Sequence, residues 1–509
     1  MTLTASPSSA SAVDRAAFGD LEVTETWVSS VDYRVVGRLL TSAALLIGAV
    51  GVALWGLVSL KFDASVRGAL GTADFLGESA AGGFSFARVL MAVQHGLPYF
   101  VVLPLFLGVA TAAIPAQIGA TRMAFPRLQA FVLWGYLTAT AVFVASFCVV
   151  DGPPMINLFA NFADSPGSNR ATDVFLGSLI LVTVVTLLGA TNIVATVATQ
   201  RRPGLRLGSI GSFSFASLIT SGVLLIATPV FLAGLGLLLL DRHFGASLLT
   251  ATGVDRFWSH MIFLPSRPEA LLFVLPGLGA MIDVVSAKAN ARPVGGSLAN
   301  ALLGAFGMLT FTAWAADAWV LNHMVQPTST LQSSLVAIPL GLLLLVALGT
   351  LGQNIKNLKP DAALLFVVGM ELLVVLGVAN IVVAAIKGVS GPGAFVWTTN
   401  QLAVMTFAAP VLGLIAAAIH FLPASAGRKA PAAASSLAGL AAIGGLAIGA
   451  LALAGLSYQS DFDNAAGALS AIALVGGLLA AGGLALSALL ALGSHRGPQL
   501  SADASEGDH

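Results

Sequence analysis

The sequence predicts an all-α protein whose helices cross a membrane twelve times. Hydrophobic residues make up 57% of the 509 positions, charged residues make up only 9%, and the mean hydropathy is +0.92. So few polar side chains could not cover a water-soluble globule, so lipid must solvate most of the surface. A hydrocarbon core about 30 Å thick is crossed by roughly 20 apolar residues of helix. Runs of that length start near Val36, Arg88, Gln129, Thr172, Ile210, Ile262, Ser297, Thr330, Ala362, Thr398, Ala432 and Ala466.

Polar turns separate these runs and indicate their orientation. The turns at 201–206 and 425–429 combine Pro or Gly with Arg and Lys, which is typical of short connections between membrane helices. Arg267 falls inside a run. Of the other basic residues, fifteen fall in connections on one side of the predicted membrane and seven on the other. By the positive-inside rule, the side with fifteen is cytoplasmic and carries both termini.

The chain divides into one membrane domain and two tails. Residues 1–30 are rich in Ser, Ala and acidic side chains and have no secretory signal, so we expect a disordered cytoplasmic tail. Residues 31–494 form the twelve-helix membrane domain, and 495–509 form a second cytoplasmic tail. The lone Cys148 excludes a centre built on paired cysteines within this chain. A net charge of zero without a basic cluster gives no sign of nucleic-acid binding.

Several stretches resemble subunit I of the heme-copper oxidases. The segment Gln117-Ile-Gly-Ala-Thr-Arg-Met-Ala-Phe-Pro-Arg127 is similar to the loop between helices II and III of that family. The segments at 267–271 (Arg-Pro-Glu-Ala-Leu) and 275–279 (Leu-Pro-Gly-Leu-Gly) stand where the family has His-Pro-Glu-Val-Tyr and Leu-Pro-Gly-Phe-Gly. The resemblance covers most of the chain. It implies the family's twelve-helix fold, a bacterial plasma membrane, and other oxidase-type or electron-transfer subunits as partners.

The resemblance also locates the family's metal ligands, and most of them are missing. Members hold two hemes and a copper ion with six histidines, and imidazole suits both metals. Five of those positions carry other residues, namely Arg267 on helix VI, Ala316 and Asp317 on helix VII, and Gln401 and Ala403 on helix X. Arginine is a permanent cation and alanine has no donor atom. The resemblance therefore implies no cofactor at the binuclear site, and it leaves His95 on helix II as the candidate ligand of a single heme.

Charged residues inside the predicted spans form a second candidate site. An unpaired charge in lipid costs ~3 kcal/mol or more, so we expect Arg267 to pair with Asp317 or with Glu269. Acids within membrane helices are functional candidates by default. The candidate polar or proton-conducting cavity comprises Arg267, Glu269, Asp283, Asp317 and Glu371. In the loop after helix II, Arg122 replaces the aspartate with which the family takes up protons, and a cation there would repel them.

These residues favour one functional hypothesis and leave two others open. The first is a noncatalytic subunit of a respiratory or electron-transfer complex, with a degenerate heme-copper centre. The second is an active terminal oxidase that passes electrons to oxygen, as family membership implies. The third is a cofactor-free conduit for protons or small molecules. Without two hemes the interior must be closed by bulky side chains, or filled by lipid, quinone or water.

Overall fold

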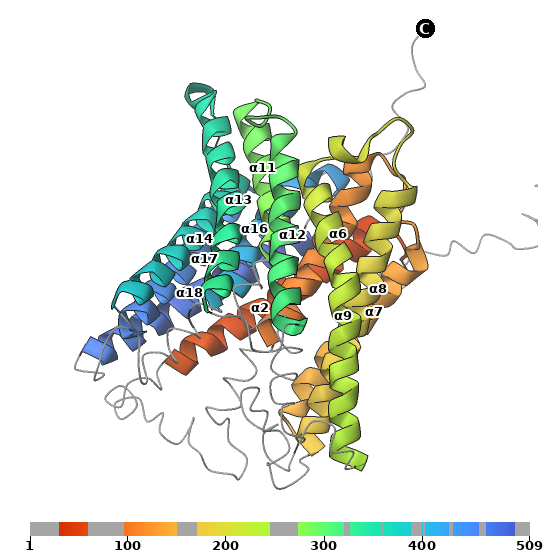
Figure 1. Ribbon diagram of the computed structural model, residues 1–509, viewed down its shortest axis with the longest axis vertical. Helices are drawn as coiled ribbons and strands as arrows, with labels where there is room; N and C mark the ends of the chain where they lie inside the picture. Colours follow the sequence, from red (N-terminus) through yellow and green to blue (C-terminus); the bar gives the residue numbers. More distant parts are fainter. Residues whose placement is uncertain are drawn as a thin grey trace, which may run out of the picture.

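The computed structural model is an all-α bundle, as the sequence predicts. It describes residues 30–59, 96–149, 170–244, 273–319, 326–358, 360–387, 400, 403–426, 431–457 and 465–493, and no strand occurs in these ranges. They form the long helices α2 (Tyr33–Ser59), α6 (Leu103–Ile118), α7 (Pro126–Ser146), α8 (Arg170–Thr199), α9 (Ser212–Phe244), α11 (Leu275–Ala289), α12 (Leu298–Trp319), α13 (Gln326–Gly352), α14 (Ala362–Lys387), α16 (Ala409–Ala426), α17 (Ala432–Ser457) and α18 (Ala465–Gly493) (Figure 1). The described residues thus contain twelve long helices, of which ten stretches are long and apolar enough to cross a membrane, so the predicted number of twelve spans is matched approximately.

Short helical turns supplement the long helices. Two π-helical turns, η2 (Leu97–Val102) and η7 (Ala403–Ala408), run directly into α6 and α16. Two 3-10 turns, η4 (Leu207–Ser209) and η6 (Ile355–Asn357), lie in connections. The helices α14 and α17 begin at the predicted residues, Ala362 and Ala432. The starts predicted near Arg88, Ile262 and Thr398 lie outside the described residues, as do positions 1–29 and 495–509 of the predicted tails.

Local chemistry explains where several helices begin and end. Pro126 opens α7, where its fixed φ suits the first helical position and its missing N–H is not needed. Gly119 ends α6 with a left-handed φ of 71°, a conformation that a glycine adopts without strain. Asn290 ends α11 in the same way, with a φ of 47°. These turns stop each helix at the polar end of its apolar run.

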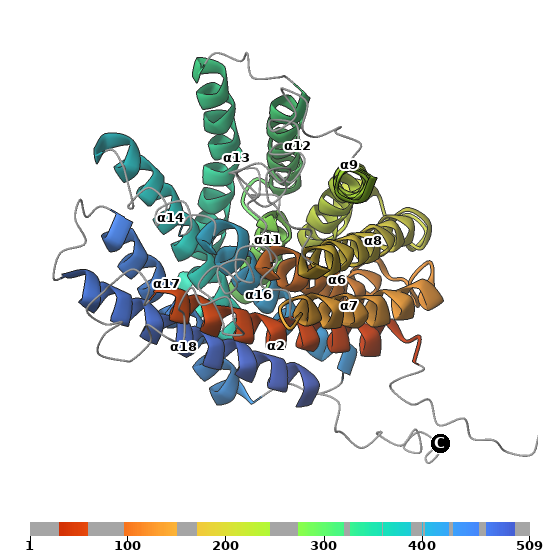
Figure 2. The ribbon, with the colours of Figure 1, turned by 90° about the horizontal axis from the view of Figure 1, so that it is seen from below.

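Small residues allow the helices at one end of the bundle to pack backbone against backbone. Figure 2 shows α18 beside both α17 and α2, and these two pairs make the most extensive contacts between helices of the described chain. A Cβ added to Gly445 would lie 2.4 Å from the backbone nitrogen of Ala480, and one added to Gly483 would lie 2.4 Å from that of Ala442. Such close approach is how helices associate in lipid, where burial of apolar surface from water supplies no driving force. Large side chains such as Leu437, 62% exposed, face outward from this cluster, as expected for contact with lipid.

Four connections gather on one face of the bundle, toward the top of Figure 1. The backbone N–H of Arg202 donates to the carbonyl of Ile118 at 3.1 Å, and the Asn354 side chain donates to the carbonyl of Ala289 at 3.0 Å. These bonds link connections that are far apart in sequence. We call this surface the basic face, because ten Arg and Lys residues of the described chain lie near the connections 119–125, 200–211, 290–297 and 353–361 or at the start of α2. They are Arg34, Arg38, Arg122, Arg127, Arg201, Arg202, Arg206, Lys288, Arg292 and Lys356.

Candidate functional site

Two π-helical turns meet in the middle of the bundle, where the second and tenth long helices approach each other. The turns η2 and η7 are in direct contact. A π turn is rare and is often found at functional sites. The resemblance to heme-copper oxidases places the low-spin heme between these two helices. Ala403, one of the positions expected to hold a heme ligand, is the first residue of η7.

The space between the two turns is nearly closed. A cavity of only about 10 Å³ remains there, between α2, η2, η7 and α17. Ordinary ligand pockets enclose roughly 300–1,000 Å³, and a cavity of this size holds about one water molecule. The residues that line it are Val52, Trp55, Leu97, Ala403, Val404, Phe407, Ala408, Leu446 and Ala450, and none of them has an imidazole.

Side chains packed onto glycine backbones account for the closure. The indole ring of Trp55 lies so close to Gly449 that an added Cβ would sit 2.8 Å from ring atom Cζ3. Leu97 lies against Gly51 in the same manner, with its Cδ2 atom 2.4 Å from where a Cβ would stand. Trp55 and Leu97 are both buried. Among the described residues, these two side chains therefore occupy most of the space beside η7.

Most of the predicted charged cavity lies beyond the residues that can be described. His95, Arg267, Glu269 and Gln401 are outside the described ranges. The backbone of Asp317 belongs to the described helix α12, but its side chain does not belong to the described part. The pairing of Arg267 with Asp317 or Glu269 therefore stays a prediction. Asp283 and Glu371 are the two members of that set whose surroundings are described.

Asp283 is half-buried on α11 and binds the start of another helix. Its Oδ1 atom accepts a hydrogen bond from the N–H of Ser212 at 2.9 Å, and its Oδ2 atom accepts one from the N–H of Phe213 at 3.0 Å. Gln117, near the end of α6, donates to Oδ2 at 3.0 Å. The carboxylate thus caps the first turn of α9 from a neighbouring helix, where the helix dipole favours a negative charge. Sequence reasoning missed this role because Gln117 and Ser212 are distant in the chain.

Glu371 has a different environment, on α14. Its Oε1 atom is buried and has no hydrogen-bond partner among the described residues. No hydrogen bond or ion pair joins it to Asp283 within the described part of the chain. The neighbouring Met370 packs where Gly277 of α11 and Gly413 of α16 approach each other. An acid in a membrane helix without a partner remains a functional candidate.

The loop between α6 and α7 is fastened to α8. The N–H of Ala124 donates to Thr196 Oγ1 at 2.9 Å, and the N–H of Phe125 donates to Asn192 Oδ1 at 3.0 Å. Asn192 donates in turn to the carbonyl of Phe125 and to Gln129 Oε1, each at 3.1 Å. These bonds fix the backbone of the loop in which Arg122 replaces the family's proton-accepting aspartate.

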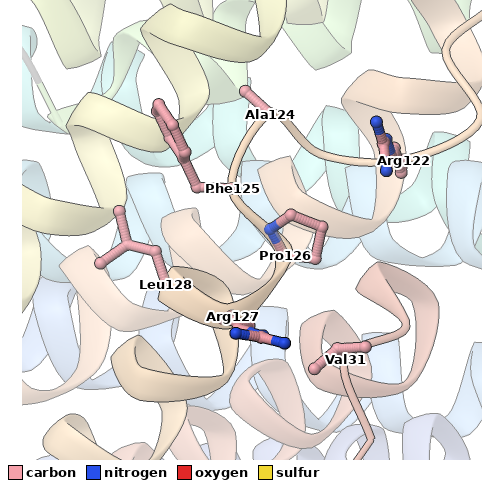
Figure 3. Close-up of a pocket in the computed structure, with 7 residues that line it drawn as sticks. All are labelled: Val31, Arg122, Ala124, Phe125, Pro126, Arg127 and Leu128. Atoms are coloured by element: carbon pink, nitrogen blue, oxygen red, sulfur yellow. The ribbon is translucent and has the colours of Figure 1, made fainter.

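Beside this loop the basic face has a pocket of about 590 Å³ (Figure 3). We call it the arginine pocket, and its lining residues are Val31, Arg122, Ala124, Phe125, Pro126, Arg127 and Leu128. Arg122 comes from the loop and Arg127 from the first turn of α7, next to Val31 from the segment that precedes α2. In the described chain neither arginine forms an ion pair or a hydrogen bond. From the sequence we predicted a positive charge at Arg122, but we did not predict a pocket beside it.

Comparisons with known proteins agree with the fold. Residues 35–479 match the family described as cytochrome c and quinol oxidase polypeptide I. The chain is 27% identical over 420 residues to "Heme-copper oxidase subunit I+III" of Aeropyrum pernix, which covers 79% of this chain and 49% of that protein. It is 26% identical over 361 residues to "Probable cytochrome c oxidase subunit 1-alpha" of Streptomyces coelicolor, covering 69% of this chain and 59% of the relative.

A third relative is similar in kind. "Probable cytochrome c oxidase subunit 1-beta" of Nocardia farcinica is 29% identical over 315 residues, which is 59% of this chain and 53% of that protein. The chain thus spans between about half and three-fifths of the length of these relatives. Since the family match extends over most of the chain, the protein is an integral membrane protein that belongs to the cytochrome c and quinol oxidase polypeptide I family.

Proposed function

We propose that this protein is a noncatalytic, subunit I-like component of a respiratory or electron-transfer complex. Its fold would hold partner subunits in a bacterial plasma membrane, with the basic face and both termini in the cytoplasm. The excess of Arg and Lys on that face supports this orientation. Membership in the oxidase family supports partners of the oxidase type, and the names of the relatives refer to subunits of such enzymes.

One observation carries the proposal: the region between η2 and η7 is filled by the protein itself. Trp55 packs onto Gly449 and Leu97 onto Gly51 beside η7, and Ala403 has no side-chain atom that could bind a metal. Interiors packed in this way do not admit a large planar group without costly rearrangement. Arg267 and Ala316 point in the same direction, because arginine and alanine offer no lone pair to a metal.

Oxygen uptake and subunit composition test this proposal together. The full-length chain would be purified in mild detergent from its native membrane, and bound proteins would be identified by mass spectrometry. We expect oxidase-type or other electron-transfer subunits to copurify. We expect no oxygen consumption with reduced cytochrome c or quinol by the chain alone. Oxygen uptake by the isolated chain that disappears in His95→Ala would establish an active oxidase and reject the noncatalytic role.

A second candidate function, a cofactor-free proton conduit, is favoured by the buried and unpartnered Oε1 atom of Glu371. A carboxyl group in that setting can accept and release a proton without breaking a hydrogen bond. Liposomes containing the protein would be tested for proton flux, with Glu371→Gln and Glu269→Gln as variants. Flux that both variants abolish supports a conduit. Absence of flux above that of empty liposomes leaves the scaffold as the function.

A further inference from the structure

The arginine pocket presents two positive charges that no described carboxylate neutralises. Arg122 and Arg127 are both exposed, and both lie at the pocket in Figure 3. Neighbouring segments add Arg34 at the start of α2 and Arg202, whose side chain packs on Gly119 at the end of α6. The described acid nearest in sequence to the lining residues is Asp32, which accepts a hydrogen bond from the N–H of Arg34. The pocket therefore attracts an anion.

The backbone at the pocket adds donors of its own. The first-turn N–H groups of a helix have no partner within that helix, and α7 has no side-chain cap. Pro126 has no N–H, and those of Ala124 and Phe125 are bound to Thr196 and Asn192. The N–H groups of Arg127 and Leu128 have no acceptor among the described residues, so they are the donors of this turn that a ligand could use. Together with the positive end of the helix dipole they favour a phosphate or carboxylate.

An apolar strip leads from the pocket along the outside of α7. Arg127, Phe131 and Trp134 follow one another at intervals of one helical turn, so they lie on the same face of the helix. Phe131 is 56% exposed and Trp134 is 37% exposed. In a membrane protein this outward face contacts acyl chains, and an aromatic ring near a charged residue is typical of the membrane interface. Phe125 and Val31 add exposed apolar surface at the pocket itself.

We propose that the arginine pocket binds the phosphate group of an anionic phospholipid, with the acyl chains lying along Phe131 and Trp134. Two guanidinium groups form paired, charge-assisted hydrogen bonds with phosphate oxygens, and the first turn of α7 supplies backbone donors. The net positive charge selects a lipid whose head group is negative over one whose head group is neutral overall. The exposed aromatic strip favours a lipid over a free phosphate ion, which would not need it.

Native mass spectrometry and thermal stabilisation of the purified full-length chain test the site. The probes are dioleoyl phosphatidylglycerol, dioleoyl phosphatidylcholine and inorganic phosphate, each titrated into the same detergent. The double variant Arg122→Gln/Arg127→Gln is compared with Arg206→Gln, which removes an exposed arginine of the basic face outside the pocket. Both proteins should unfold at the same temperature without lipid, because all three side chains are exposed.

The variants separate the contribution of the two arginines to lipid binding from that of the apolar strip. The double variant should bind phosphatidylglycerol at least about tenfold more weakly, which corresponds to the loss of one charge-assisted hydrogen bond. Arg206→Gln should bind like the wild type. Phe131→Ala/Trp134→Ala should weaken binding of the long-chain lipid without changing any response to phosphate.

Three outcomes would overturn the proposal. The first is equal affinity of the double variant and Arg206→Gln for phosphatidylglycerol. The second is equal affinity of the wild type for phosphatidylglycerol and phosphatidylcholine. The third is inorganic phosphate binding as tightly as the lipid, with no effect of the aromatic substitutions, which would make the pocket a site for a soluble phosphate.

Discussion

Two half-buried acids show how much the surroundings of a residue decide its role. Asp283 and Glu371 both belong to apolar helices, and from the sequence they had the same standing as candidates. Asp283 has three donors from α6 and α9, so its charge stabilises the packing of three helices. Glu371 has an oxygen atom without a partner, which a purely structural role does not explain. Of these two acids, Glu371 is therefore the better candidate for a group that binds and releases protons.

The capping role of Asp283 predicts a large loss of stability on substitution. Asp283→Ala leaves two backbone N–H groups at the start of α9 and the Gln117 amide without an acceptor. The expected cost is about 3 kcal/mol in the free energy of unfolding. The thermal midpoint in detergent measures it. Asp173→Ala is the control, since Asp173 forms a partly exposed contact with His243 at 3.4 Å and should cost less than about 1 kcal/mol. Equal midpoints for the two variants would contradict the cap.

At the scale of elements, the loop between α6 and α7 owes its position to side chains of α8. Thr196→Val removes the acceptor of the Ala124 N–H, so the loop should open more often. A loss of about 1.4 kcal/mol makes trypsin cleave after Arg122 about tenfold faster. Thr191→Val is the matched control, because that hydroxyl donates only to the carbonyl of Leu187 in its own helix. A cleavage rate that is the same in both variants would show that the anchoring is not needed.

The contact between α17 and α18 gives a second test at this scale. Gly445→Ala would bring a methyl group within 2.4 Å of the Ala480 nitrogen, whereas nothing lies within 4 Å of a Cβ added at Gly444. We expect Gly445→Ala to destabilise the fold by about 1–3 kcal/mol, as overpacking does. Gly444→Ala should be neutral or stabilise by up to ~1 kcal/mol, through helix propensity. The thermal midpoints of the two variants are compared with that of the wild type. A lower midpoint for Gly445→Ala alone supports close packing of α17 on α18, and equal midpoints for both variants would contradict it.

At the scale of the whole molecule, the long apolar runs of the sequence predict an all-α bundle of membrane helices, and the structure confirms it. A long apolar run that crosses lipid must be helical, because its backbone groups can then bond only within the run. The start of such a run is therefore the start of a helix, as α14 and α17 show. The sites were harder to predict, because they depend on contacts between distant segments. Counting along the chain identified Ala403 as a substituted ligand position, but it could not show that Trp55 and Leu97 fill the space beside it. The arginine pocket likewise forms only because Val31, which precedes α2, lies beside Arg127 in the first turn of α7.

The central claim is that this member of the oxidase family keeps the fold without the heme-copper centre. It is tested most directly by a pyridine hemochrome assay combined with copper analysis on the purified full-length chain. The filled region between η2 and η7 and the substituted ligand positions predict neither stoichiometric heme nor stoichiometric copper. Two hemes and one copper ion per chain would contradict the account, because Trp55 and Leu97 would then have to lie elsewhere.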